Sequence, residues 1–141
     1  MDLLVNLDVP DLARAVAFYE AAFGLTVTRR FGQGGVELCG WPVRLYLLQH
    51  PAGTVGAGGD LRRYERHWCP VHLEVVVEDL EPALARALAA GAIAETEVRE
   101  EAWGRIVTLA DPFGHGLCLI QFLNRGYDEI ADPAWSRSRF E

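Results

Sequence analysis

Pairs of polar residues that are two positions apart occur in three strand-like segments, and such pairs lie on one face of a strand. The pairs are Asn6 and Asp8, Arg44 and Tyr46, and His72 and Glu74. An imidazole beside a carboxylate is suited to general acid–base chemistry, because a partly buried carboxylate near histidine can have its pKa moved toward neutrality. An arginine can hold a carboxylate or phosphate through two hydrogen bonds. The alternative is that these side chains satisfy one another in a network or internal ion pair, because buried charges are generally paired.

The composition argues against several other chemistries. All 13 basic residues are arginine, and the lack of lysine removes Schiff-base catalysis and the phosphate-loop lysine. The only serines, Ser136 and Ser138, lie in the C-terminal tail, which argues against a serine hydrolase. The net charge of −7 argues against a nucleic-acid partner. The three cysteines, Cys39, Cys69 and Cys118, have no CxxC spacing, which disfavours a disulfide framework and a structural zinc site.

The sequence also predicts where the protein resides. No segment approaches the roughly 18 apolar residues of a membrane helix. The N-terminal residues Met-Asp-Leu-Leu lack the basic start and the cleavage site of a signal peptide. Half of the 141 residues are hydrophobic, which is enough to bury a core without disulfides. We therefore expect one compact, soluble, cytoplasmic protein without a membrane partner.

The elements that must position these residues occur twice in the chain. The run Val5–Leu12 returns as Leu73–Leu80, and the run Leu45–Gln49 returns as Leu117–Gln121. In each half a strand-like run precedes an Asp-Leu helix start, and an apolar strand that ends in Gln closes the unit. An internal repeat decides the architecture, and two copies of one unit can enclose a cavity between them.

Hydrophobic periodicity and turn residues define the elements of each copy. The first copy has predicted strands over 3–9, 25–31, 35–39 and 43–49, with a helix from 11 to 23. The second has strands over 71–77, 93–99, 104–110 and 116–122, with a helix from 79 to 91. The predicted organisation is a first βαβββ unit (1–49), a linker (50–70), a second βαβββ unit (71–122) and a C-terminal tail (123–141). The tail contains Tyr127, Trp135 and Phe140, so it either packs on the body or a partner or is loose.

The duplicated unit, Ala17-Phe18-Tyr19 in the first helix and the run 111–116 (Asp-Pro-Phe-Gly-His-Gly) resemble the vicinal oxygen chelate superfamily. This superfamily includes glyoxalase I, bleomycin and fosfomycin resistance proteins and extradiol dioxygenases. The resemblance covers residues 3–122. It implies an α+β fold in which two tandem βαβββ units form a curved half-barrel around a central cavity. It also implies a homodimer, because many relatives dimerise through edge strands.

The resemblance further implies where a metal would bind. Metal-dependent members have a His at the start of each unit's first strand and a Glu or Gln in each last strand. The matching positions here are Leu4, Tyr46, His72 and Cys118. Leucine cannot ligate and neutral tyrosine is a poor ligand, so two ligands remain where zinc needs at least three. We therefore expect a degraded metal site and no cofactor, with a remodelled divalent-metal site as the alternative.

If the matching positions face the cavity, their neighbours two residues away face it as well. The expected ligand-binding wall consists of Asn6, Asp8, Arg44, Tyr46, His72, Glu74 and Cys118. The first hypothesis is a protein that binds a small organic ligand without chemistry. The second is an enzyme (lyase, isomerase or dioxygenase-like) that uses His72 and Glu74 as catalytic acid–base groups or a remodelled metal site.

Two further residues of the sequence have alternative roles. Cys118 is either a nucleophile, if His72 stabilises its thiolate, or a packed, inert thiol. His115 lies in the turn of the family motif, where we expect a structural hydrogen bond.

Overall fold

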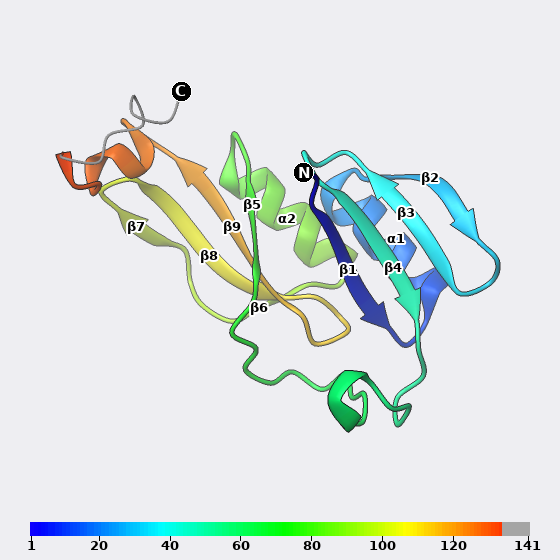
Figure 1. The fold of residues 1–141 in the computed structure, drawn as a ribbon. Helices are drawn as coiled ribbons and strands as arrows, with labels where there is room; N and C mark the ends of the chain where they lie inside the picture. The colour runs from blue at the N-terminus through cyan, green and yellow to red at the C-terminus, as the bar shows by residue number, and fades with distance from the viewer. Residues whose placement is uncertain (134–141) are drawn as a thin grey trace.

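The computed structural model describes residues 1–133, and it contains two βαβββ units joined by a long connection (Figure 1). The first unit contains β1 (Leu4–Val9), α1 (Leu12–Phe23), β2 (Thr26–Phe31), β3 (Gly35–Cys39) and β4 (Arg44–Gln49). Its sheet has the order β1-β4-β3-β2, with β1 parallel to β4 and the other pairs antiparallel. These bounds agree closely with the strands and the helix predicted from the sequence.

The second unit repeats this order. It contains β5 (Leu73–Val76), α2 (Leu80–Ala90), β6 (Ile93–Ala94), β7 (Arg99–Glu101), β8 (Gly104–Ala110) and β9 (Gly116–Phe122). Its sheet has the order β5-β9-β8-β6, and β7 also pairs with β8. The single strand predicted over 93–99 is therefore wrong, because it is divided between β6 and β7. At the division the hydroxyl of Thr96 accepts the Thr108 amide hydrogen in place of a backbone carbonyl, which interrupts the ladder.

The glutamine that ends each closing strand has a structural function. The Gln49 side-chain oxygen accepts from the Leu12 amide at 2.8 Å, and that of Gln121 accepts from the Leu80 amide at 3.1 Å. Each glutamine thereby satisfies one of the free amides in the first turn of its own unit's helix. The repeated Gln therefore ties the last strand of each unit to the start of its helix.

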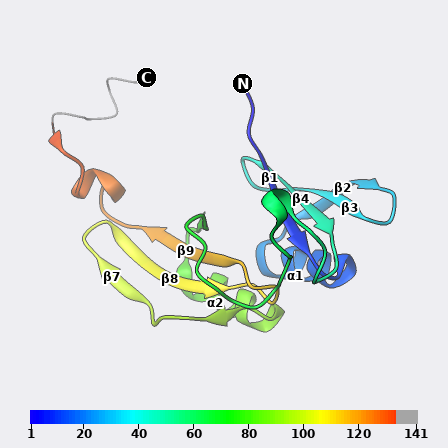
Figure 2. The same ribbon diagram turned by 60° about the horizontal axis from the view of Figure 1, so that its bottom comes forward.

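The two helices pack against each other and cover one face of each sheet, while the opposite face stays uncovered (Figures 1 and 2). Side chains from both units form one hydrophobic core, which includes Phe18, Leu45, Leu80 and Leu119. The sheets are not joined by hydrogen bonds, so β1 and β5 are both edge strands. The predicted α+β fold with two tandem units and an open, curved half-barrel is confirmed. No helix within residues 1–133 is long and apolar enough to cross a membrane.

A buried carboxylate joins the two units. Asp111, in the turn before β9, has a fully buried side chain that accepts a hydrogen bond from the Tyr19 hydroxyl of α1 at 2.7 Å. The other donors are the amides of Phe113 (2.8 Å) and His115 (2.9 Å) and the His115 ring nitrogen Nδ1 (2.7 Å). Burial, with the charge of Asp111 adding to it, raises the pKa of Tyr19 well above its ordinary value. The hydrogen bond expected for His115 is therefore present.

The connection between the units is held to both of them. Arg62 Nε lies 2.8 Å from the carboxylate of Asp8 in β1, and Arg66 Nε lies 2.9 Å from that of Glu95 in the second unit. Between them, the backbone at Tyr64 crosses Gly114 so closely that a Cβ there would lie 2.7 Å from the Tyr64 carbonyl oxygen. Only glycine allows this approach at φ +89°. We call residues 50–72 the connecting segment.

The described part of the C-terminal tail packs on the second unit. The ring of Tyr127 lies 5.0 Å from that of Trp103 and 4.7 Å from that of Phe122. The other two aromatic residues singled out in the tail, Trp135 and Phe140, lie outside the described residues.

Replacing Tyr19 with phenylalanine tests the contact that joins the units. Tyr19→Phe removes one donor from a buried carboxylate, and we expect the free energy of unfolding to fall by about 1–3 kcal/mol. The control is Tyr127→Phe, whose hydroxyl lies 3.4 Å from the half-exposed Glu74, and it should change stability by less than about 0.5 kcal/mol. Denaturant titration measures both, and equal losses would contradict a special role for Tyr19.

Candidate functional site at the junction of the units

Three chemically active side chains converge on the uncovered face of the second sheet. His72 lies immediately before β5, Glu74 lies within it, and Cys118 is the register partner of Glu74 on β9. His72 Nε2 lies 3.3 Å from Glu74 Oε1. The ligand-type atoms of all three residues lie within 4.8 Å of one another. Because His72 and Glu74 are exposed and Cys118 is buried, the imidazole and the carboxylate are the accessible groups.

The environment of Cys118 favours the packed-thiol alternative. Burial raises the pKa of this thiol, and the negative charge of Glu74 adds to the rise, while the hydroxyl of Thr108 at 3.7 Å from Sγ lowers it. A thiol with a raised pKa stays protonated at neutral pH and is a weak nucleophile. The acid–base pair of His72 and Glu74 does not depend on this thiol.

Two hollows meet at His72. The larger, which we call the junction hollow, has a volume of about 380 Å³ and lies between β1, the connecting segment, the start of β5 and the turn before β9. The smaller, the sheet hollow, has about 220 Å³ and lies over Glu74, Ile106, Thr108 and Cys118. Both are lined by Cys69, His72 and Gly116. His72 is therefore positioned to contact a molecule in either hollow.

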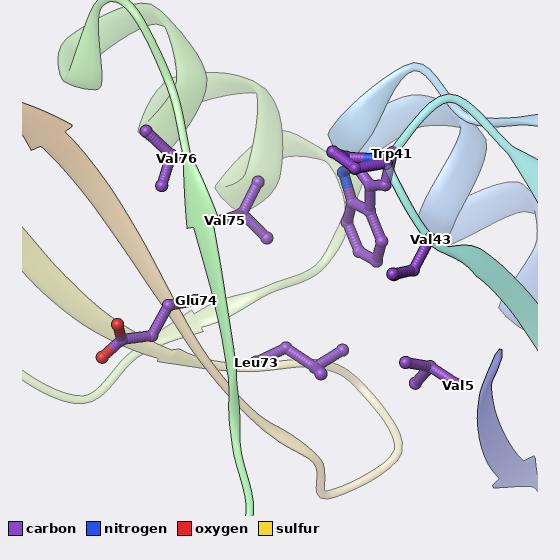
Figure 3. Close-up of a pocket in the computed structure, with 8 residues that line it drawn as sticks. Val5, Trp41, Val43, Leu73, Glu74, Val75 and Val76 are labelled. Atoms are coloured by element: carbon purple, nitrogen blue, oxygen red, sulfur yellow. The ribbon is translucent and has the colours of Figure 1, made fainter. Parts of the chain in front are cut away.

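A third, mostly apolar cleft separates the two edge strands (Figure 3). It has a volume of about 350 Å³, and its wall consists of Val5, Trp41, Pro42, Val43, Leu73, Glu74, Val75 and Val76. In Figure 3 Leu73 and Val75 point toward Val5, Val43 and Trp41, whereas Glu74 leaves β5 on the opposite side. The alternation along β5 thus gives one face to this cleft and the other to the site around His72. Val5 and Leu73 also line the junction hollow, so the cleft adjoins it.

The equivalent face of the first unit is closed by a hydrogen-bonded network. Glu37 is 4% exposed. Its carboxylate accepts from the Tyr46 hydroxyl (2.6 Å), from Arg29 Nε (3.0 Å) and Nη2 (2.5 Å), and from the Thr28 hydroxyl (2.8 Å). The hydrogen bond from Arg29, followed by those from Tyr46 and Thr28, lowers the pKa of Glu37 to about 2. Tyr46, which occupies a metal-ligand position of the superfamily pattern, is therefore already bonded within the protein.

The structure divides the predicted ligand-binding residues into separate groups. Asn6 and Asp8 line the junction hollow together with His72, and Asp8 is paired there with Arg62. His72, Glu74 and Cys118 form the group on the second sheet. Tyr46 belongs to the Glu37 network, and Arg44 forms an exposed ion pair with Asp2 at 2.7 Å between Nη2 and Oδ2. Tyr46 and Arg44 therefore bond to Glu37 and Asp2, and not to a group in a cavity shared with His72 and Glu74.

Some residues of the site escaped the sequence analysis. Glu37 carried a recognisable signal, since it is a lone charge in the otherwise apolar strand Gly-Val-Glu-Leu-Cys. Arg63 lines the junction hollow because the connecting segment folds back over the turn before β9. No local pattern of residues predicts that return of the chain.

Comparisons with known proteins show the family to which the sequence is similar. The sequence model of the glyoxalase-like domain family matches residues 4–120. An uncharacterized protein of Mycobacterium bovis is 30% identical over 115 residues, which cover 78% of this chain and 76% of that protein. A Mycobacterium tuberculosis relative, also uncharacterized, is 30% identical over 115 residues, which cover 78% of this chain and 68% of its own.

Solved structures share the fold at low sequence identity. The fosfomycin resistance protein FosX of Listeria monocytogenes has a TM-score of 0.69 at 15% identity, covering 92% of this chain and 96% of its own. TioX of a Micromonospora species has a TM-score of 0.66 at 22% identity, covering 87% of this chain and 99% of its own. A glyoxalase/bleomycin resistance/dioxygenase family enzyme of Burkholderia phytofirmans has a TM-score of 0.68 at 18% identity, covering 87% of this chain and 100% of its own. These likenesses show the fold.

The closed network of the first unit gives a prediction in acid. Unfolded Glu37 takes up a proton near its ordinary pKa of 4.5, whereas folded Glu37 does so near 2. The unfolded state therefore binds more protons between these values, and this contribution to stability is lost as the pH falls through that range. We expect Glu37→Gln to flatten the dependence of unfolding free energy on pH in that window. Glu20→Gln, at an exposed carboxylate on α1, is the control and should retain the wild-type slope.

Proposed function

The chain belongs to the glyoxalase-like domain family of the vicinal oxygen chelate superfamily, and from this premise we propose that it binds a small organic ligand at the junction of its two units. The observation that carries the proposal is the position of His72, which lines both the junction hollow and the sheet hollow. A volume of about 380 Å³ lies within the usual range of small-molecule sites, roughly 300–1,000 Å³. The fold likeness to a fosfomycin resistance protein supports a ligand of this size class.

The residues at the four family metal positions support binding over the superfamily's usual metal chemistry. Leu4 offers no ligand atom, and the hydroxyl of Tyr46 donates to Glu37. Half of the usual ligand set is thus unsuited to a metal, while His72 of the other half and the neighbouring Glu74 stay accessible. A partly exposed imidazole beside a carboxylate, next to an apolar wall that includes Leu7 and Leu73, suits a ligand with both polar and apolar parts.

A remodelled metal enzyme is the second candidate, and one observation favours it. His72, Glu74 and Cys118 bring one nitrogen, one oxygen and one sulfur donor within 4.8 Å of one another. Glu74, which lies outside the family's ligand positions, supplies the third donor that the sequence pattern lacked, and three protein ligands are the usual number in catalytic zinc sites. A divalent ion held by these residues would polarise a substrate oxygen or acidify a water. A metal-free form of this enzyme would instead use Glu74 and His72 to hold or move a proton beside the substrate.

The binding proposal predicts the effect of removing the shared imidazole. In a ligand-detected NMR screen of small organic compounds, we expect His72→Ala to weaken binding of the hits about tenfold, the cost of one lost hydrogen bond. His50→Ala is the matched control, because His50 lines neither hollow. Hits that bind both variants equally well would place the ligand elsewhere.

The same hits separate binding from catalysis. If the protein only binds, none of the hits is converted, and Glu74→Gln changes affinity alone. A reproducible turnover that Glu74→Gln abolishes would replace the binding proposal with the enzyme, since the amide cannot take up a proton as the carboxylate does.

Metal analysis distinguishes the second candidate. On the binding proposal we expect substoichiometric metal after native purification, and weak zinc uptake that Cys118→Ser leaves unchanged. Stoichiometric zinc that is lost in Cys118→Ser and retained in Cys39→Ser would support the metal enzyme, because Cys39 is not among the three clustered donors.

A further inference from the structure

The junction hollow is rich in hydrogen-bonding nitrogen groups. Arg63, His67, His72 and His115 all line it, and they come from the connecting segment and the turn before β9. The side chain of Arg63 forms no hydrogen bond, ion pair or ring contact with any other residue in the range 1–133. Most other arginines in this part of the chain hold a carboxylate, so an unpaired guanidinium at a hollow is a group available to a ligand.

The single carboxylate among the residues that line this hollow is already neutralised. Asp8 Oδ2 lies 2.8 Å from Arg62 Nε. Glu74 lines the sheet hollow and is not among the residues that line the junction hollow. The charge facing the junction hollow is therefore positive, although the chain as a whole carries −7. This positive charge increases the affinity of the hollow for an anionic ligand and decreases its affinity for a cationic one.

Two of the imidazoles are held in fixed orientations. The Nδ1 atom of His115 lies 2.7 Å from the Asp111 carboxylate, and that of His67 lies 2.9 Å from the Glu65 carbonyl oxygen. Both partners are acceptors, so each Nδ1 carries the hydrogen and donates it. The remaining ring nitrogen of each, Nε2, has no partner among the described residues. A protonated imidazole donates from Nε2 to a carboxylate oxygen, and a neutral one accepts from a hydroxyl group.

Another part of the wall is apolar. Leu7 and Val5 come from β1, Leu73 from β5, and Phe113 from the turn before β9. A ligand that fills this space gains from burial of an apolar body as well as from the charged contact. A wall with a positively charged part and an apolar part is suited to an amphipathic ligand with one anionic end.

We propose that the junction hollow binds an organic carboxylate with an apolar body, and that Arg63 holds its carboxylate. The proposal rests on the ligand-binding function above and names its ligand class. A guanidinium binds a carboxylate through two parallel hydrogen bonds, which gives direction as well as attraction. His67 and His115 flank that end of the ligand, and His72 contacts it from the side of the sheet hollow.

Three probes with the same ring test the ligand class. Isothermal titration calorimetry compares benzoate, benzyl alcohol and benzylamine with the full chain. We expect benzoate to bind at least about tenfold more tightly than benzyl alcohol, the difference expected for a charge-assisted contact, and benzylamine to bind more weakly than either. Equal affinities of the three compounds, or no measurable binding of benzoate, would overturn the proposal.

Variants of Arg63 test the residue. Arg63→Gln should remove the advantage of benzoate over benzyl alcohol, and Arg63→Lys should retain part of it, because lysine keeps the charge without the planar fork. Arg86→Gln, at an exposed arginine on α2, is the matched control and should bind benzoate as the wild type does. Since the Arg63 side chain forms no hydrogen bond, ion pair or ring contact with another residue in the range 1–133, these variants should fold normally, which circular dichroism checks.

Failure of this proposal is distinguishable from failure of the proposed function. If Arg63→Gln leaves benzoate binding unchanged while His72→Ala weakens benzyl alcohol, the carboxylate assignment is wrong and the ligand-binding function stands. If His72→Ala changes the affinity of neither the probes nor any hit from the wider screen, the proposed function fails as well.

Discussion

The carboxylate of Asp111 is buried between the two units, and the arrangement of the molecule depends on how it is satisfied. A buried carboxylate is costly unless hydrogen bonds replace its hydration. Here the donors come from α1 of the first unit and from the turn before β9 of the second. Both segments must therefore be in place at once, which fixes α1 and the turn relative to each other. The same carboxylate orients His115, so a contact that holds the fold together also shapes one wall of the junction hollow.

The two units share a scaffold and differ in what their uncovered faces do. Both units use a glutamine at the end of the last strand to cap their helix. In both, a polar residue of the first strand is paired with a residue of the last strand, Asn6 with Tyr46 and Glu74 with Cys118. On the first unit Glu37 binds Tyr46 and Arg29, and the face is satisfied by the protein itself. On the second unit Thr108 stands at the position equivalent to Glu37, and His72 and Glu74 stay accessible. The face of the first unit is thus closed by its own hydrogen bonds, whereas the face of the second keeps an imidazole and a carboxylate accessible.

A single core joins the units, and the connecting segment is held to both by ion pairs. The hollow that these parts enclose is therefore set by the fold. Preformed sites of this kind lose little conformational entropy when a ligand binds. The fold of the family supports many reactions and binding functions, so the proposed ligand binding rests on the residues around His72 and Arg63.

The sequence by itself determined the repeat, the class of fold and nearly all element bounds, because these follow from local periodicity, turn residues and helix starts. It also placed Leu4 and Tyr46 at two of the family's four metal-ligand positions and put His72 and Glu74 on one strand face. Only the tertiary structure decided which polar residues meet. Tyr46 bonds to Glu37, Asp8 to Arg62 and Asp111 to Tyr19, and these partners are far apart in the chain or lie on different elements. Such pairings depend on strand register, on helix packing and on the return path of the connecting segment. Local sequence does not predict them, because each brings together residues from different elements.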